Sequence, residues 1–373
     1  MEQVLYSLPD GWEWKRIEDV FTITSGKNLT KKDMHVEGKF SVYGGNGIAG
    51  RYNDFNLSGS NIIIGRVGAL CGNVRLVHGD IWVTDNAFFI KEYKVDILKE
   101  YLAKVLSTLN LGETANKAAQ PVISYKGIKD LVIPYPPLDE QKRIVEKLNA
   151  MLTRIDTAIE HLQESVTLAD MLYASELNEI FNPKSLPINQ SGIYELPHGW
   201  EWKRIEDVFT ITSGKNLTKK DMHVEGKFSV YGGNGIAGRY NDFNLSGSNI
   251  IIGRVGALCG NVRLVHGDIW VTDNAFFIKE YKVDILKEYL AKVLSTLNLG
   301  ETANKAAQPV ISYKGIKDLV IPYPPLDEQK RIVEKINNIG KLQIALKKQL
   351  QFKISSLGQL KASILDSAFK GKL

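Results

Sequence analysis

The chain has 373 residues, of which 44% are hydrophobic and 24% charged, and a formal net charge of +5, which is ordinary globular composition for two or more domains. Its two cysteines, Cys71 and Cys259, stand beside apolar residues and argue against a disulfide framework. Because it has no charged-then-apolar leader and no apolar run of about 18 residues, we expect a soluble, cytoplasmic protein rather than a secreted or membrane-spanning one.

Most of the sequence occurs twice in the chain. Gly11 to Lys147 and Gly199 to Lys335 are identical at a constant offset of 188, which makes 137 matched residues. A repeat of this length is a whole domain and not a solenoid unit. The chain is therefore predicted to consist of two similar halves in tandem.

Within the first copy, short segments rich in β-branched and aromatic residues alternate with Gly, Asn and Asp. They predict strands at 40–43, 61–67, 73–77, 81–84 and 87–91. Apolar residues three and four apart predict an amphipathic helix from Asp96 to Leu109. The segment DLVIPYPP, at 130–137, reads as a last strand that prolines terminate. Each copy is thus expected to be an α+β domain.

The stretch YGGNGIAGRYNDF, at Tyr43 to Phe55, contains the spacing of a dinucleotide-binding loop. Gly45, Gly47 and Gly50 satisfy G-x-G-x-x-G, but that fingerprint requires a following helix and an acidic residue about 20 positions later. Here turn-forming residues follow instead, and the acidic residue is missing. The pattern favours a glycine-rich turn between two strands.

A long segment without glycine or proline follows the first copy, and a segment of similar length and spacing, with three glycines, follows the second. In the first, apolar residues alternate steps of four and three from Ile144 to Tyr173, which is the heptad pattern of a coiled coil. The second is spaced similarly, at Ile332, Ile336, Ile339, Leu346, Leu350, Ile354, Leu357 and Ile364. We predict a first domain at 1–137, a long helix at 138–182, a linker at 183–192, a second domain at 193–325 and a second long helix at 326–373.

The two predicted helices carry opposite charge. Residues 138–182 have 4 Lys/Arg against 9 Asp/Glu, and residues 326–373 have 10 against 4. Unlike charges along flanking positions select a partner helix, so we predict that the two helices form an antiparallel intrachain coiled coil. Two solvated faces of opposite charge remain the alternative.

Basic and amide side chains gather in the turn-rich stretches of each copy, where they are candidates for phosphate contacts and for base readout. Lysines 27, 31 and 32 are expected at phosphates, whereas Asn28 and Gln120 are candidates for adenine contacts. Arg66 lies inside a strand pattern and could be structural or DNA-facing. The candidate DNA-binding residues are Lys27, Asn28, Lys31, Lys32, Asn46, Arg51, Lys117, Gln120 and Lys126, with their copies Lys215, Asn216, Lys219, Lys220, Asn234, Arg239, Lys305, Gln308 and Lys314.

The sequence offers no catalytic motif. It lacks a Walker A loop, H-E-x-x-H, G-x-S-x-G and a metal-spaced Cys/His cluster. The segment YPPL, at Tyr135 to Leu138, approaches the [DNS]-P-P-[YFW] signature of amino-group DNA methyltransferases, but both deciding positions differ. We therefore expect no catalytic site and no metal in this chain.

The ordered set of motifs in each copy resembles the specificity subunit of Type I restriction-modification systems. Each copy opens LP-x-GWEWKRIEDVFTITSGK, continues through YGGNGI and GRVGALCGNV, and closes PVISYKGIKDLVIPYPPLDEQKRIVEK into its long helix. The resemblance implies two target recognition domains that read a bipartite site in double-stranded DNA. It also implies two methyltransferase subunits and restriction subunits as partners, with S-adenosylmethionine and ATP bound on those partners and no cofactor on this chain.

The chain departs from the family pattern because its two recognition domains are identical. If antiparallel helices invert one domain relative to the other, both should read the same base pairs on opposite strands, which predicts an interrupted palindrome. Two other functions stay open at this point. One is a stand-alone DNA methyltransferase, and the other is a coiled-coil adaptor without a nucleic-acid role.

Overall fold

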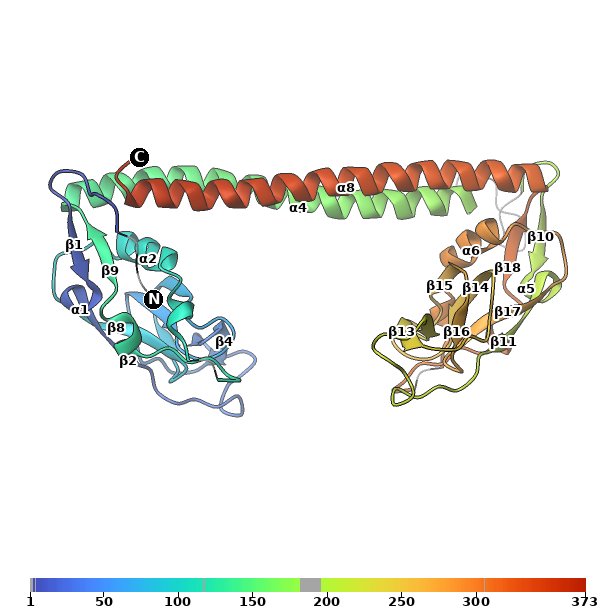
Figure 1. Ribbon diagram of the computed structural model, residues 1–373, viewed down its shortest axis with the longest axis horizontal. Coiled ribbons are helices and arrows are strands. Elements are labelled where there is room, and N and C mark those ends of the chain that lie inside the picture. The colour runs from blue at the N-terminus through green and yellow to red at the C-terminus, as the bar shows by residue number, and fades with distance from the viewer. Residues whose placement is uncertain (1–2, 4, 117, 182–195, 305) are drawn as a thin grey trace. The chain divides into compact units, whose positions relative to one another are not determined.

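The computed structural model describes residues 3, 5–116, 118–181, 196–304 and 306–373. They form two compact units (Figure 1). Unit 1 comprises Met1–Gln163 and Gln351–Leu373, and unit 2 comprises Glu164–Leu350. Each unit contains one copy of the duplicated domain together with a part of each long helix. The linker predicted at 183–192 lies outside the described residues.

The domain of unit 1 is built from short strands and three short α-helices. In chain order its elements are β1 (Glu13–Arg16), α1 (Ile17–Val20), β2 (Phe21–Ser25), β3 (Phe40–Gly44), β4 (Gly47–Tyr52), β5 (Ser60–Gly65), β6 (Val74–His78), β7 (Ile81–Val83), β8 (Ala87–Tyr93), α2 (Lys99–Thr108), the 3-10 helix η1 (Leu111–Thr114), α3 (Tyr125–Ile128) and β9 (Val132–Tyr135). The α+β prediction is confirmed.

Unit 2 repeats this order. Its elements are β10 (Glu201–Arg204), α5 (Ile205–Val208), β11 (Phe209–Ser213), β12 (Phe228–Gly232), β13 (Gly235–Tyr240), β14 (Ser248–Gly253), β15 (Val262–His266), β16 (Ile269–Val271), β17 (Ala275–Tyr281), α6 (Lys287–Thr296), the 3-10 helix η2 (Leu299–Thr302), α7 (Tyr313–Ile316) and β18 (Val320–Tyr323). Identical sequence thus gives the same elements in both domains.

Three sheets form each domain. In unit 1 the strand orders are β2-β8-β5-β6, β4-β3-β7 and β1-β9. The pair β3 and β7 is parallel, and the other pairs are antiparallel. The glycine stretch is a tight turn between β3 and β4, with no helix after it, so the prediction of a turn is confirmed.

The main core of unit 1 lies between the four-stranded sheet and α2. The fully buried Tyr101 of α2 donates its hydroxyl proton to the carbonyl oxygen of Pro134 in β9 at 2.9 Å. Burial raises the pKa of Tyr101, so the hydroxyl stays protonated and keeps this hydrogen bond. Because the bond joins α2 to the strand that precedes the first long helix, it fixes where that helix starts.

The first long helix, α4 (Leu138–Phe181), is attached to the domain before it. Ile144 and Leu148 of α4 are fully buried in the core of unit 1. The buried amide of Gln141 accepts a hydrogen bond from the backbone N–H of Leu98 and donates one to the carbonyl of Pro136, both at 2.9 Å. Since Leu98 is the N-cap residue of α2, this one side chain joins the first turns of two helices.

The second long helix, α8 (Leu326–Phe369), ends in the core of unit 1, although it follows the domain of unit 2. Phe369 packs edge to face on Tyr101, with 5.7 Å between the ring centroids. In unit 2 the roles are exchanged, because α8 begins on the core with Ile336 and α4 ends in it. There Phe181 packs on Tyr289, again at 5.7 Å. Each domain core therefore contains the start of one long helix and the end of the other.

The long helices pair antiparallel within each unit, as predicted (Figure 1). In unit 1 Asp156 of α4 binds Lys361 of α8 at 2.7 Å, and Arg143 donates to the carbonyl of Leu373 at 2.9 Å. In unit 2 Asp170 binds Lys347 at 2.7 Å. The acidic and basic biases of the two helices thus meet in defined ion pairs.

One predicted coiled-coil position is wrong. Leu346 was assigned to the buried stripe of the second helix, but its side chain is 46% exposed. The contact in this part of unit 2 is made by smaller and polar groups. Gln343 donates to Asp170 at 2.6 Å, and Gly340 lies against the ring of Tyr173.

The ion pair of unit 1 gives a testable prediction. Asp156→Lys is expected to lower the stability of unit 1 by up to about 1 kcal/mol, because it places a second cation beside Lys361 at a solvent-exposed position. Adding Lys361→Asp should recover part of the loss, measured as a coupling energy in a double-mutant cycle of thermal unfolding. Glu160→Lys is the control, since Glu160 is exposed and makes no ion pair among the described residues. If the coupling energy between Asp156→Lys and Lys361→Asp is no larger than that between Glu160→Lys and Lys361→Asp, the assigned ion pair is contradicted.

Candidate DNA-binding surface

Five connections meet at one end of each domain, which we call the loop end. In unit 1 they are residues 26–39, 45–46, 66–73, 84–86 and 115–124, with 117 outside the description. Backbone hydrogen bonds join them: Lys27 donates to Val83 at 3.0 Å, Arg66 to Asn86 at 2.9 Å, and Gly68 to Pro121 at 2.9 Å. Figure 1 shows that within each unit this end is remote from α4 and α8.

The glycine turn lies at the centre of the loop end. A Cβ atom on Gly45 would be 2.0 Å from the carbonyl oxygen of Val67, so no larger residue fits against this neighbouring loop. Asn46 at the tip is exposed. In unit 2 the side-chain oxygen of its copy Asn234 accepts a hydrogen bond from the backbone N–H of Leu258 at 3.2 Å. The side-chain amide at this position, which was predicted to contact DNA, therefore also stabilises the turn.

The connection between β2 and β3 carries the predicted lysines. Lys27, Lys31 and Lys32 are exposed, and among the described residues no carboxylate lies within ion-pair distance of them. The backbone around them is ordered, because Trp82 donates its indole N–H to the carbonyl of Lys27 at 3.2 Å and Thr30 donates to Asp33. Three uncompensated cations on a fixed loop are suited to phosphate contacts.

Asn28 lies next to Lys27 on this connection and is exposed, as is its copy Asn216. Gln120 is exposed on the neighbouring 115–124 connection, where Pro121 is bound to Gly68. Both amides that were proposed for adenine readout therefore lie at the loop end.

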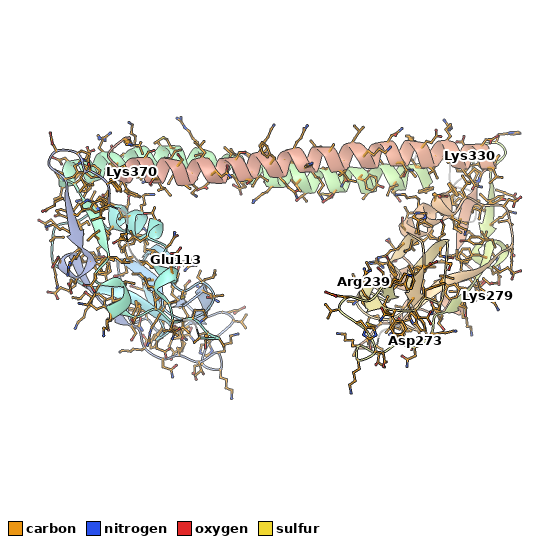
Figure 2. The ribbon with its side chains drawn as sticks, in the orientation of Figure 1. Glu113, Arg239, Asp273, Lys279, Lys330 and Lys370 are labelled. Atoms are coloured by element: carbon orange, nitrogen blue, oxygen red, sulfur yellow. The ribbon has the colours of Figure 1, made fainter. Side chains whose placement is uncertain are left out.

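Arg51, by contrast, uses its guanidinium within the protein. It donates from Nε to the carbonyl of Gly38 at 2.5 Å and from Nη2 to the carbonyl of Lys39 at 2.8 Å. Its copy Arg239 makes the same two bonds to Gly226 and Lys227. Figure 2 labels Arg239 on β13. The role of this arginine in the described contacts is to hold the neighbouring turn.

Lys126 lies outside this group, and the copies described in unit 2 repeat the exposure seen in unit 1. Lys126 is exposed on α3, whose Tyr125 hydroxyl donates to the carbonyl of Phe21 at 3.0 Å. Phe21 begins β2, whereas Lys27 follows the end of that strand, so Lys126 lies by the other end of β2. Lys117 and its copy Lys305 lie outside the described residues. The copies Lys215, Lys219, Lys220, Gln308 and Lys314 are exposed in unit 2, as their partners are in unit 1.

Arg66 is anchored inside the loop end. Its Nη1 donates to the carbonyl of Asp85 at 3.1 Å, and its guanidinium lies 5.4 Å from the ring centre of Phe88, which is buried. In unit 2 the copy Arg254 donates to the carbonyl of Asp273, and Figure 2 shows Asp273 at the end of unit 2 remote from Lys330 of α8. These contacts give Arg66 a structural role in the described residues.

A stack of three aromatic rings supports the loop end, and the sequence reasoning did not single it out. His35 stacks on Tyr52 with 6.0 Å between centroids and 4° between planes, and Tyr52 meets Trp82 edge to face at 5.1 Å. The rings come from three separate segments, and β4 and β7 contain one aromatic residue each, so no local pattern in the sequence could have suggested the cluster.

A polar hollow recurs beside the glycine turn in both units. In unit 1 it has a volume of about 480 Å³, and its lining includes Asn73, Arg75, Asn110 and Glu113, which Figure 2 labels.

The described residues contain no group of three or more His, Cys, Asp or Glu side chains that could hold a metal ion. In the same residues no helix is long and apolar enough to span a bilayer.

Comparison with known proteins gives a family for this fold and surface. The family model of the Type I restriction modification DNA specificity domain matches residues 9–168 and again 197–356, the same offset as the internal repeat. The chain belongs to this family. Its two domains are thus two specificity domains in tandem, which confirms the resemblance drawn from the sequence motifs.

Individual relatives of this specificity-domain protein are distant in sequence. It is 25% identical over 323 residues to a putative type I specificity subunit of Mycoplasma pneumoniae, covering 84% of each chain. It is 23% identical over 423 residues to the type I restriction enzyme MjaVIII specificity subunit of Methanocaldococcus jannaschii, covering 98% of this chain and 94% of the relative. A chain solved in a study of complex assembly and conformational transition of the type I R-M system has the same fold, with a TM-score of 0.75 at 22% identity and coverage of 99% and 100%.

Proposed function

We propose that this chain is the sequence-reading subunit of a Type I restriction-modification system and that each loop end reads one half of a bipartite site in double-stranded DNA. The observation that carries the proposal is the double match to the DNA specificity domain, one match on each unit. The loop end supplies suitable chemistry, because it combines exposed, unpaired lysines with the exposed amides of Asn28 and Gln120.

The chain itself would be non-catalytic. Two methyltransferase subunits and restriction subunits are the expected partners, with S-adenosylmethionine and ATP bound to those subunits and no cofactor on this chain. Support comes from the relatives, which are named specificity subunits of type I enzymes. An assembly that acts on cellular DNA would work in the cytoplasm.

Because the two domains are identical, both halves of the site are expected to be the same few base pairs. If the domains are inverted, these base pairs lie on opposite strands and the expected target is an interrupted palindrome. Methylome sequencing of a host that carries this subunit with its methyltransferase measures this directly. A direct repeat would contradict inversion, and two unrelated half-sites would contradict the claim that identical domains read alike.

Two other functions are separated from this one by binding measurements. A stand-alone methyltransferase would require the purified chain to bind labelled S-adenosylmethionine. A coiled-coil adaptor without a nucleic-acid role would show no salt-sensitive binding to duplex DNA, either alone or with partners. Affinity purification from the host, which should recover a methyltransferase subunit, tests the assembly itself.

A further inference from the structure

A tight turn on the 26–39 connection presents one bare apolar side chain, beside the end of β4 that is opposite the glycine turn. The turn spans residues 35–38, and the backbone N–H of Gly38 closes it by donating to the carbonyl of His35 at 3.4 Å. Val36 at its tip is 96% exposed, and the copy Val224 is 97% exposed. These are the most exposed large hydrophobic side chains among the described residues.

The turn is held from several directions. The backbone N–H of His35 donates to the carbonyl of Arg51 at 2.9 Å, and Arg51 in turn binds the carbonyls of Gly38 and Lys39 with its guanidinium. The ring of His35 lies flat against Tyr52. A Cβ atom on Gly38 would be 2.5 Å from the backbone nitrogen of Tyr52, so the turn lies directly against β4.

These contacts do nothing to bury Val36. An isolated exposed valine needs no explanation, since much of any protein surface is apolar. Here, however, an exposed arginine uses its donors to fix a turn whose tip stays in water. Fixing a side chain before binding removes the entropy cost of ordering it on contact, so the arrangement favours a partner that touches Val36.

The charge of the connection that carries Val36 indicates what that partner is. Its exposed charged side chains are basic on balance, which suits a polyanion: Lys27, Lys31, Lys32 and Lys39 against Asp33 and Glu37. Resting on the proposed function, we propose that Val36 and Val224 each contact the 5-methyl group of a thymine in the major groove of a half-site. Valine is short and stiff at χ1, which suits a methyl contact better than insertion between base pairs, where longer apolar side chains serve.

The test replaces thymines singly by deoxyuridine, which lacks the 5-methyl group. The protein is the full chain with its methyltransferase subunits. The probe is a duplex that contains the target sequence identified by methylome sequencing. In the wild type, one thymine per half-site should weaken binding about fourfold when replaced, and replacing both should weaken it about fifteenfold, as expected for one buried methyl group per contact. Val36→Ala with Val224→Ala should bind both duplexes alike.

Ile48→Ala with Ile236→Ala is the matched control, because these side chains are also exposed, at 65% and 64%, on the neighbouring strands. The control should keep the thymine sensitivity. The inference is overturned if no thymine gives a loss that depends on Val36, if the control abolishes the loss, or if the half-sites contain no A·T pair. A fluorescence rise of 2-aminopurine beside the contact would reveal a wedge and overturn it as well. Failure of the proposed function is distinct, since the wild-type complex would then bind the site no better than a scrambled duplex.

Discussion

Phe369→Ala is expected to destabilise unit 1 by about 3–5 kcal/mol, the usual cost of truncating a buried phenylalanine. Phe369 is 4% exposed and packs on Tyr101, although the two residues are separated by most of the chain. Hydrogen exchange followed by mass spectrometry can separate the units only through the long helices, because the peptides of α2 and β9 are identical to those of α6 and β18. Protection should fall at 148–163 and 351–373 in unit 1 and stay unchanged at 164–181 and 336–350 in unit 2.

Two further variants complete this experiment. Phe181→Ala removes the equivalent contact with Tyr289 and should produce the opposite pattern, with the loss confined to unit 2. Phe352→Ala is the control on the same helix as Phe369, because its side chain is 73% exposed and its loss should cost little. Equal loss of protection in both units after Phe369→Ala would refute the assignment of the helix end to unit 1.

Gly45→Ala is expected to destabilise the loop end severely, by more than about 3 kcal/mol. The added Cβ would lie 2.0 Å from the carbonyl oxygen of Val67. Neither atom can rotate away, because the backbone fixes the position of both. The β3–β4 turn and the 66–73 connection must then separate. Thermal unfolding measures the loss of stability, and binding to the target duplex should fall with it because the candidate contacts are no longer held together.

The adjacent glycine supplies the control for this prediction. A Cβ on Gly44 would find the Thr84 hydroxyl at 3.5 Å and the Ala49 side chain at 3.7 Å, which are ordinary contact distances. Gly44→Ala should therefore be tolerated, with binding close to that of the wild type. If both variants behave alike, close packing of the Gly45 backbone is not the reason for glycine at that position.

Local patterns in the sequence were sufficient for much of the fold. The β-branched segments became β3, β5, β6, β7 and β8, and the helical spacing became α2. The predicted strand at 61–67 is shorter in the structure, since β5 ends at Gly65 and Val67 instead bridges Val122. That bridge depends on a segment more than fifty residues later, which no local pattern reveals.

The ends of the long helices were not predicted, for a related reason. A heptad pattern treats the whole helix as one seam, whereas the last turns of α4 and α8 pack into domain cores. A signal was present, because ASELNEIF at 174–181 and ASILDSAF at 362–369 share Ala, Ser, Leu and Phe at the repeat offset of 188. These matches lie outside the identical segment, where the two copies otherwise differ.

For the candidate site, the sequence indicated which residue types are present but not which of their side chains form contacts within the protein. Lys31 and Lys32 could be proposed as phosphate contacts because lysines in loops usually have their ammonium groups exposed to solvent. Whether Arg51 faces solvent or holds a turn depends on where the carbonyls of Gly38 and Lys39 lie, and that is set by the packing of the turn against β4. Asn28 and Gln120 stay predictions, since the structure places them at the loop end without a nucleic acid.

The order in which the chain is synthesised differs from the order in which its units can be completed. Unit 2 is one continuous segment, Glu164–Leu350, whereas unit 1 combines Met1–Gln163 with Gln351–Leu373. The Tyr6 hydroxyl donates to the carbonyl of Phe369 at 2.7 Å, so the two ends of the chain meet in unit 1. Domains generally fold as they emerge from the ribosome, N-terminal first. Here the domain that emerges first must wait, with the Tyr101 face of its core uncovered, until the last turns of α8 have been made.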